Sequence, residues 1–156
     1  AWESAFSLWS AISGGVNVIY HAAGWLEGGL CASYEKFIMD CETLQQMIVY
    51  MRPVGNSDTD IAFDAIQEVG PNGHFFGAQH TQERYETAFY GPFLSDWSNF
   101  ESWEEAGAVQ TPERANRIWK KILAEFDPPP LDTAIAEELL AFVARRKQEG
   151  GAPTDF

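Results

Sequence analysis

One short stretch of the chain, residues 20–27, gathers side chains that suit the binding of a cationic ligand. The aromatic faces of Tyr20 and Trp25 attract a quaternary ammonium ion, and the carboxylate of Glu27 supplies the opposite charge. The imidazole of His21 is able to hydrogen-bond a substrate carboxylate or a cofactor side chain. The alternative is that these residues have a structural role. His21 is then a core histidine with its hydrogen bonds made, Trp25 packs in the core, and Glu27 begins a helix.

A second candidate site follows the aromatic run His74–Ala78, which we interpret as a short strand. Gln79 and His80 then lie at the end of that strand, where polar groups reach a pocket. A straight strand would separate His74 from His80 by ~20 Å, which is too far for one metal ion. Because no Cys/His cluster has zinc spacing either, we expect no metal site. A buried aromatic segment with polar ends explains the same residues.

The elements around the first site predict an α/β arrangement. Apolar residues at helical spacing predict a helix over residues 1–13, ended by two glycines. Val16–His21 is short, β-branched and aromatic, which favours a buried strand. A long amphipathic helix is expected from Glu27 or Gly28 to Arg52. In a (β/α)8 barrel, His21 at the C-terminal end of such a strand would face the active site.

The rest of the chain is predicted to be mainly helical. Gly70-Pro71-Asn72-Gly73 breaks the chain, and three consecutive prolines precede the last helix. Two strands do not make a stable parallel sheet, so we expect missing strands upstream or pairing with another copy. The further helices are expected at residues 57–69, near 82–88 and 100–105, from Thr111 to Phe126, and from Asp132 to Lys147. In the last of these helices, the apolar stripe is expected to be buried: Ile135, Ala136, Leu139, Leu140 and Val143.

Composition restricts the partners. The formal net charge of -13 repels nucleic acid and anionic membranes, and suits cationic ligands or basic protein partners. No apolar run approaches the ~20 residues of a membrane helix, and no signal peptide is recognisable, so we expect a cytoplasmic protein. Cys31 and Cys41 are interpreted as buried small hydrophobes in a reducing compartment, and if both lie on one helix they are ~15 Å apart, beyond the reach of a disulfide. The chain begins at Ala1, which we interpret as the start of a fragment.

Several motifs resemble the C-terminal part of the trimethylamine methyltransferase family. They are spread over almost the whole chain. The matching stretches are residues 19–38, Gly70–Gly77, His80–Tyr85, Leu94–Trp97, Trp103–Gly107 and Arg114–Asn116.

The resemblance implies an α/β fold in which this chain is the C-terminal fragment of a (β/α)8 TIM barrel. Residues 1–95 would supply its last strands and helices, and residues 96–156 a helical extension. As an isolated chain it would be mostly α-helical with one or two short strands. The fragment is expected to be inactive alone and to form homo-oligomers.

The same resemblance implies methyl transfer from a methylated or quaternary amine, such as trimethylamine or glycine betaine. The acceptor would be the cobalt of a corrinoid (cobalamin) carried by a separate corrinoid-binding protein, so no cofactor is bound directly. Tyr20, His21, Trp25, Glu27 and His80 would then lie near the substrate or the corrinoid, with the catalytic residues upstream. Two alternatives remain: a helical interaction module without catalytic activity, and an amine-binding protein without turnover.

Overall fold

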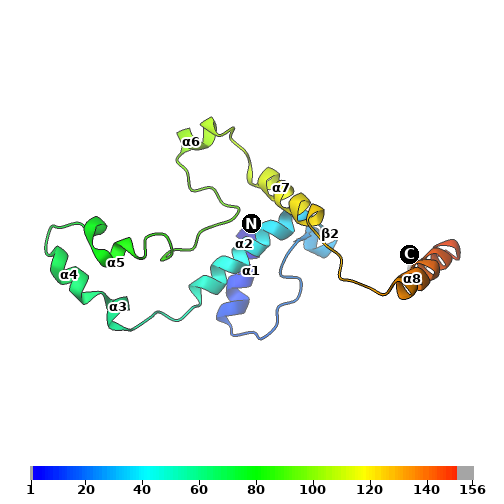
Figure 1. Cartoon of the computed structure of the whole chain (residues 1–156), viewed down its shortest axis with the longest axis horizontal. Helices are drawn as coiled ribbons and strands as arrows, with labels where there is room; N and C mark the ends of the chain where they lie inside the picture. Colours follow the sequence, from blue (N-terminus) through cyan, green and yellow to red (C-terminus); the bar gives the residue numbers. More distant parts are fainter. Residues whose placement is uncertain (1, 151–156) are drawn as a thin grey trace. The chain divides into compact units, whose positions relative to one another are not determined.

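The computed structural model describes residues 2–150, which are mostly helical and contain one hairpin of two short strands (Figure 1). The chain forms two compact units, one reaching Leu123 and the other beginning at Ala124. In chain order the elements are α1 (Trp2–Ser13), β1 (Trp25–Leu26), the 3-10 helix η1 (Glu27–Gly29), β2 (Cys31–Ala32), α2 (Tyr34–Tyr50), α3 (Asp58–Ile61), α4 (Phe63–Val69), the 3-10 helix η2 (Phe75–Gly77), α5 (Gln79–Gln82), α6 (Phe100–Glu105), α7 (Thr111–Ala124) and α8 (Thr133–Gln148).

Helix α1 confirms the first predicted helix, but the strand expected over Val16–His21 is wrong. After α1 the chain turns through Gly15, at φ +73°, and continues as irregular backbone. Val18 and Tyr20 are 67% and 83% exposed, so these two large side chains of the segment are not packed. A strand also needs a hydrogen-bonding neighbour, and both strands of residues 2–150 pair with each other instead. Apolar, β-branched composition alone is therefore not enough for a strand here.

The next segment is a hairpin where the sequence predicts the start of a helix. Trp25 pairs with Ala32 and Leu26 with Cys31 in antiparallel register. Between them η1 closes the turn, with Gly28 in the left-handed region at φ +64°. Helix α2 consequently starts at Tyr34 instead of Glu27 or Gly28, capped by the Ser33 side chain, which accepts a hydrogen bond from the Lys36 amide.

The burial predicted for the two cysteines is wrong for Cys31. Cys31 lies in β2 and is exposed, whereas Cys41 lies in α2 and is half-buried. The two thiols therefore belong to different elements, and only one of them is shielded from solvent.

The segment 57–85 contains shorter elements than predicted. The helix expected over residues 57–69 is split into α3 and α4 at Ala62, which adopts a left-handed φ of +55°. The strand expected at His74–Ala78 is wrong, because residues 75–77 form the 3-10 helix η2. The helix expected near residues 82–88 is also displaced, since α5 ends at Gln82 and irregular turns follow.

The C-terminal helices start and end close to their predicted positions. Helices α6 and α7 occupy residues 100–105 and 111–124, and Asp132 caps α8 through hydrogen bonds from the Ala134 and Ile135 amides. The predicted burial of the apolar stripe of α8 is wrong, because α8 contains no buried residue.

The core of the first unit forms around α2. Helix α1 packs against α2 through the region of Leu8, which is 5% exposed (Figure 1). On its other side, Ile38 of α2 packs with Leu94 and with Ala115 of α7, and Met39, Ile118 and Trp119 surround this cluster. Helix α2 is thus the element against which α1, the hairpin and α7 pack.

The described residues therefore confirm a mostly helical chain with two short strands. They contain one antiparallel hairpin and no parallel sheet between residues 2 and 150. The predicted division into residues 1–95 and 96–156 concerns a larger protein and stays a prediction.

Candidate functional site

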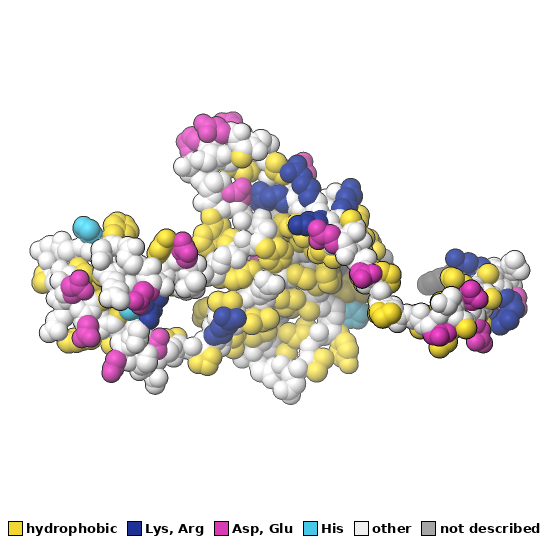
Figure 2. All heavy atoms as spheres, in the orientation of Figure 1, with side chains coloured by type: hydrophobic (Ala, Val, Ile, Leu, Met, Phe, Trp, Pro, Cys, Tyr) yellow, Lys and Arg dark blue, Asp and Glu magenta, His cyan; other side chains and the backbone are white. Residues whose placement is uncertain are grey.

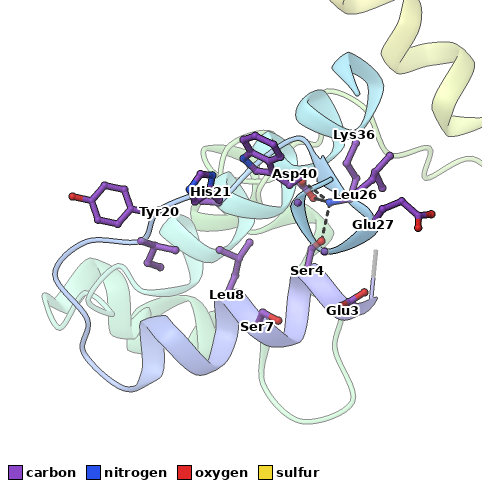
Figure 3. Close-up of a pocket in the computed structure, with 15 residues that line it drawn as sticks. Glu3, Ser4, Ser7, Leu8, Tyr20, His21, Leu26, Glu27, Lys36 and Asp40 are labelled. Carbon is purple, nitrogen blue, oxygen red and sulfur yellow. Dashed lines mark hydrogen bonds and ion pairs between the residues drawn. The ribbon is translucent and has the colours of Figure 1, made fainter. Parts of the chain in front are cut away.

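An open pocket of about 650 Å³ lies where α1, the loop after it, the hairpin and the start of α2 meet (Figure 3). Four of the five residues that the sequence predicts as substrate-binding line this pocket: Tyr20, His21, Trp25 and Glu27. The loop and the hairpin therefore bring the four together, although the strand expected to position them does not form.

Two of these residues make one aromatic contact. The rings of His21 and Trp25 meet edge to face, with centroids 5.0 Å apart and an interplanar angle of 71°. His21 has a left-handed φ of +56°, which turns the backbone between Tyr20 and the hairpin. The Tyr20 ring, 83% exposed, points away from the pocket, as does the Glu27 carboxylate (Figure 3).

The pocket contains a cluster of polar side chains that the sequence analysis did not single out. The ammonium of Lys36 lies 2.5 Å from the carboxylate of Asp40 and donates to the Ser4 hydroxyl at 2.7 Å (Figure 3). Asp40 is 4% exposed and also accepts a hydrogen bond of 2.9 Å from the Gly24 amide. This cluster joins α1, the start of the hairpin and α2, and so fixes the frame around His21 and Trp25.

The lining of the pocket is negatively charged. The residues that line it include three carboxylates, those of Glu3, Glu27 and Asp40, and one ammonium, that of Lys36, so acidic groups outnumber the basic one. Because Lys36 is already paired with Asp40, the unbalanced charges belong to Glu3 and Glu27. Such a lining attracts a cation.

One signal in the sequence would have indicated the polar cluster. Lys36 and Asp40 are four residues apart, which places them on one side of a helix. Asp40 is also adjacent to Cys41 and two positions from Ile38, on the buried side of the apolar stripe. A carboxylate in such a position needs a partner, and Lys36 is the residue within reach.

His80 is not part of this pocket. It lies in α5, and its Nε2 is hydrogen-bonded to the backbone oxygen of Thr59 at 2.9 Å. His74, the other histidine outside the pocket, contacts the Phe76 ring in a tilted arrangement, with centroids 5.7 Å apart. Among residues 2–150, no three His, Cys, Asp or Glu side chains lie close enough to hold a metal ion.

The sequence was compared with known protein families and curated proteins. The profile described as trimethylamine methyltransferase (MTTB) matches residues 1–151. The chain belongs to the trimethylamine methyltransferase family. The resemblance inferred from the motifs is thereby confirmed.

Individual members of the trimethylamine methyltransferase family match over most of this chain. It is 41% identical to a glycine betaine methyltransferase of Desulfitobacterium hafniense strain Y51, over 96% of this chain and 31% of that protein. It is 33% identical to the trimethylamine methyltransferase MttB of D. hafniense strain DCB-2, over 88% of this chain and 27% of the relative. It is 29% identical to the trimethylamine methyltransferase MttB2 of Methanosarcina mazei, over 83% of this chain and 26% of the relative.

The chain thus spans less than a third of the length of these curated family members. Within the described residues, none of the helices has the length and apolar character needed to cross a membrane.

Proposed function

We propose that this chain is part of a methyltransferase that takes a methyl group from a quaternary or methylated amine, of the glycine betaine or trimethylamine type. Two independent observations support the proposal. The chain belongs to a family whose relatives are named for these donors. The pocket formed by α1, the hairpin and α2 has more acidic than basic side chains in its lining and includes the partly exposed Trp25, an environment that suits a cation without N–H donors.

The pocket suits binding and positioning of the amine. A quaternary ammonium has no hydrogen to donate, so aromatic faces and unpaired carboxylates hold it instead of hydrogen bonds. Trp25 would contact the methyl groups, with its ring orientation fixed by the edge contact to His21. Glu27 and Glu3 would supply long-range attraction, because both carboxylates lie at the rim of the pocket.

The acceptor in this proposal is the cobalt of a corrinoid carried by a partner protein. The acceptor would supply an electron pair to the methyl carbon as the C–N bond breaks, and the amine would leave with the electrons of that bond. Because the leaving tertiary amine is neutral, no proton has to move for a quaternary donor. The protein then has to hold the methyl carbon in line with the metal and exclude water.

The rest of the site would come from the larger part of the protein, in a (β/α)8 barrel. The chain spans less than a third of the relatives' length, and the pocket is open at one side in the residues described. We therefore expect amine binding by this chain to be weak and methyl transfer to require the complete protein. Oligomerisation of the complete protein and a cytoplasmic location belong to the same proposal.

Calorimetric titration with tetramethylammonium and glycine betaine tests the binding step. Trp25→Ala is expected to weaken binding about tenfold, the loss of one cation–π contact. Trp97→Ala is the matched control, because Trp97 is 70% exposed and does not line the pocket. Equal affinities for the two variants would show that Trp25 does not contact the amine.

The transfer step has a separate test. The complete protein is mixed with a reduced corrinoid protein and each candidate amine, and the cobalt absorption spectrum is followed. A donor-dependent change supports methyl transfer. Amine binding without any spectral change would favour a binding protein without turnover, and loss of both would favour the alternative of a helical interaction module.

A further inference from the structure

Helix α8 exposes an apolar stripe that its own unit has no element to cover. The unit that begins at Ala124 contains, among its described residues, this helix alone. Five large apolar side chains of α8 are about half exposed or more: Ile135, Leu139, Leu140, Phe142 and Val143. Figure 2 shows apolar side chains of this helix at the surface beside acidic and basic ones. A single amphipathic helix of this length is marginal in water unless its stripe is packed.

The stripe has the spacing of a two-helix seam. Ile135, Leu139 and Phe142 follow one another at steps of four and three, as the inner positions of a coiled coil do. Glu138 and Arg145 are seven residues apart, so both lie on the same edge of this seam. The Arg145 guanidinium lies 5.4 Å from the centroid of the Phe142 ring, which places it beside the seam.

We propose that α8 pairs with α8 of a second copy of this chain, in antiparallel orientation. With Leu139 opposite Phe142 of the second copy, two-fold symmetry repeats the same contact on the other side of the axis. Glu138 of each copy then lies opposite Arg145 of the other, because both residues occupy the same edge and the helices run in opposite directions. The charge pattern of this surface is thus complementary to itself.

The parallel arrangement is disfavoured by the same charges. In parallel helices the last turn of one helix lies beside the last turn of the other, and this turn carries Arg145, Arg146 and Lys147. Like charges at that distance repel, and Glu138 then has no basic residue opposite it. The antiparallel orientation moves the basic turn next to the N-terminal half of the other helix, which carries Glu137 and Glu138.

The size of the interface sets the expected strength. Sixteen residues make a helix ~24 Å long, which is about two heptads. Such a pair buries less than the ~800 Å² per partner of a standard interface. Pairing is therefore expected to be reversible and to depend on protein concentration.

Sedimentation equilibrium of the 156-residue chain over a range of concentrations tests the proposal by exchanging the charges. Glu138→Arg and Arg145→Glu each place like charges opposite one another, so each is expected to weaken self-association about tenfold. The double variant restores opposite charges and is expected to return to the original dissociation constant. Glu137→Arg is the matched control, because the heptad spacing places Glu137 on the outer face.

Circular dichroism separates pairing from helix stability. Arg145→Glu puts an acidic residue in the last turn and lowers helicity slightly, but the double variant keeps this defect and is still expected to associate. Failure of the double variant to recover, or equal effects of Glu137→Arg and Glu138→Arg, would overturn the antiparallel pair. A chain that is monomeric at all concentrations would mean that another part of the protein covers α8.

Discussion

Helix α2 and the segment 57–85 use charged side chains in opposite ways. On α2, Asp40 and Glu42 are each 4% exposed, and they bind backbone amides 16 to 53 residues away in the sequence. The Glu35 carboxylate accepts hydrogen bonds from Asn116 and Trp119 of α7, which are 81 and 84 residues away in the sequence. In segment 57–85 the side-chain hydrogen bonds are mostly local, such as the Ser57–Asp60 capping box and Gln79–Glu83.

The difference indicates what each carboxylate contributes. A buried carboxylate that accepts several hydrogen bonds holds a remote segment in place, and its removal leaves buried donors without a partner. An exposed pair within one turn competes with water and contributes little. The fold around the candidate pocket should therefore depend on the acidic residues of α2, whereas segment 57–85 should tolerate the loss of its own.

The largest expected effect is that of Glu42→Ala. Glu42 accepts hydrogen bonds from the Leu94 amide at 2.6 Å, from the Ser95 amide at 3.0 Å and from the Ser95 hydroxyl. Arg114 holds the same loop from α7 by donating to the Leu94 carbonyl at 2.9 Å. We expect the variant to lower the free energy of unfolding by about 3 kcal/mol, measured by urea denaturation.

Hydrogen exchange gives this prediction a local readout. The amides of Leu94 and Ser95 should lose protection in Glu42→Ala before other core amides do, because their acceptor is gone. Glu83→Ala is the matched control in the other region, since Glu83 binds only Gln79 and Arg84 at the surface, and it should change stability by less than about 0.5 kcal/mol. Similar losses for both variants would remove the distinction between the two regions.

The same contrast explains which parts of the fold can be predicted from the sequence. Helices with a cap and a periodic stripe, such as α7 and α8, depend on neighbouring residues and were predicted to within a few residues. The backbone of residues 16–21 depends on whether a partner strand exists, which composition does not reveal. The break at Ala62 depends on a left-handed φ that alanine rarely adopts, so no local signal marks it.

The candidate site was predicted in part for a related reason. Tyr20, His21, Trp25 and Glu27 are close in sequence, so any compact backbone brings them near one pocket. Ser4, Lys36 and Asp40 reach it from α1 and α2, and their meeting depends on how these helices pack. Whether the predicted residues bind an amine stays a prediction until the titrations described above are made.

A smaller effect on the stability of the fold is expected at low pH. Hydrogen bonds from Asn116 and Trp119, with a further one from Ser33, lower the pKa of Glu35 from its ordinary value of 4.5 to about 2. A carboxyl with a lowered pKa in the folded state stabilises the fold above pH 4.5, and this contribution is lost as the pH falls towards 2. In Glu35→Gln, the dependence of unfolding free energy on pH across this window should be flatter.

The titration of the side chain itself provides the direct measurement. Carbon-detected NMR of the Glu35 carboxyl should give a midpoint near 2, and Asn116→Ala should move it upward, because the hydrogen bond that lowers this pKa most is lost. The pKa values of Asp60 and Glu83 are also lowered, by hydrogen bonds from Ser57 and from Gln79. The Asn116→Ala variant is therefore needed to assign the titration midpoint to Glu35. A midpoint near 4.5 would mean that the link between α2 and α7 does not form.

The smallest effect is expected at His80, in the region of local contacts. Its imidazole is hydrogen-bonded to the Thr59 carbonyl at the surface, so His80→Ala should cost less than about 1 kcal/mol. The same variant should change the affinity for tetramethylammonium less than twofold, because His80 does not line the pocket that contains Trp25. His21→Ala is the matched comparison, since it removes the edge contact that orients the Trp25 ring and should weaken binding several-fold. A loss of affinity in His80→Ala as large as that in His21→Ala would place segment 57–85 at the amine, and the distinction between a binding region and a surface region of this chain would then fail.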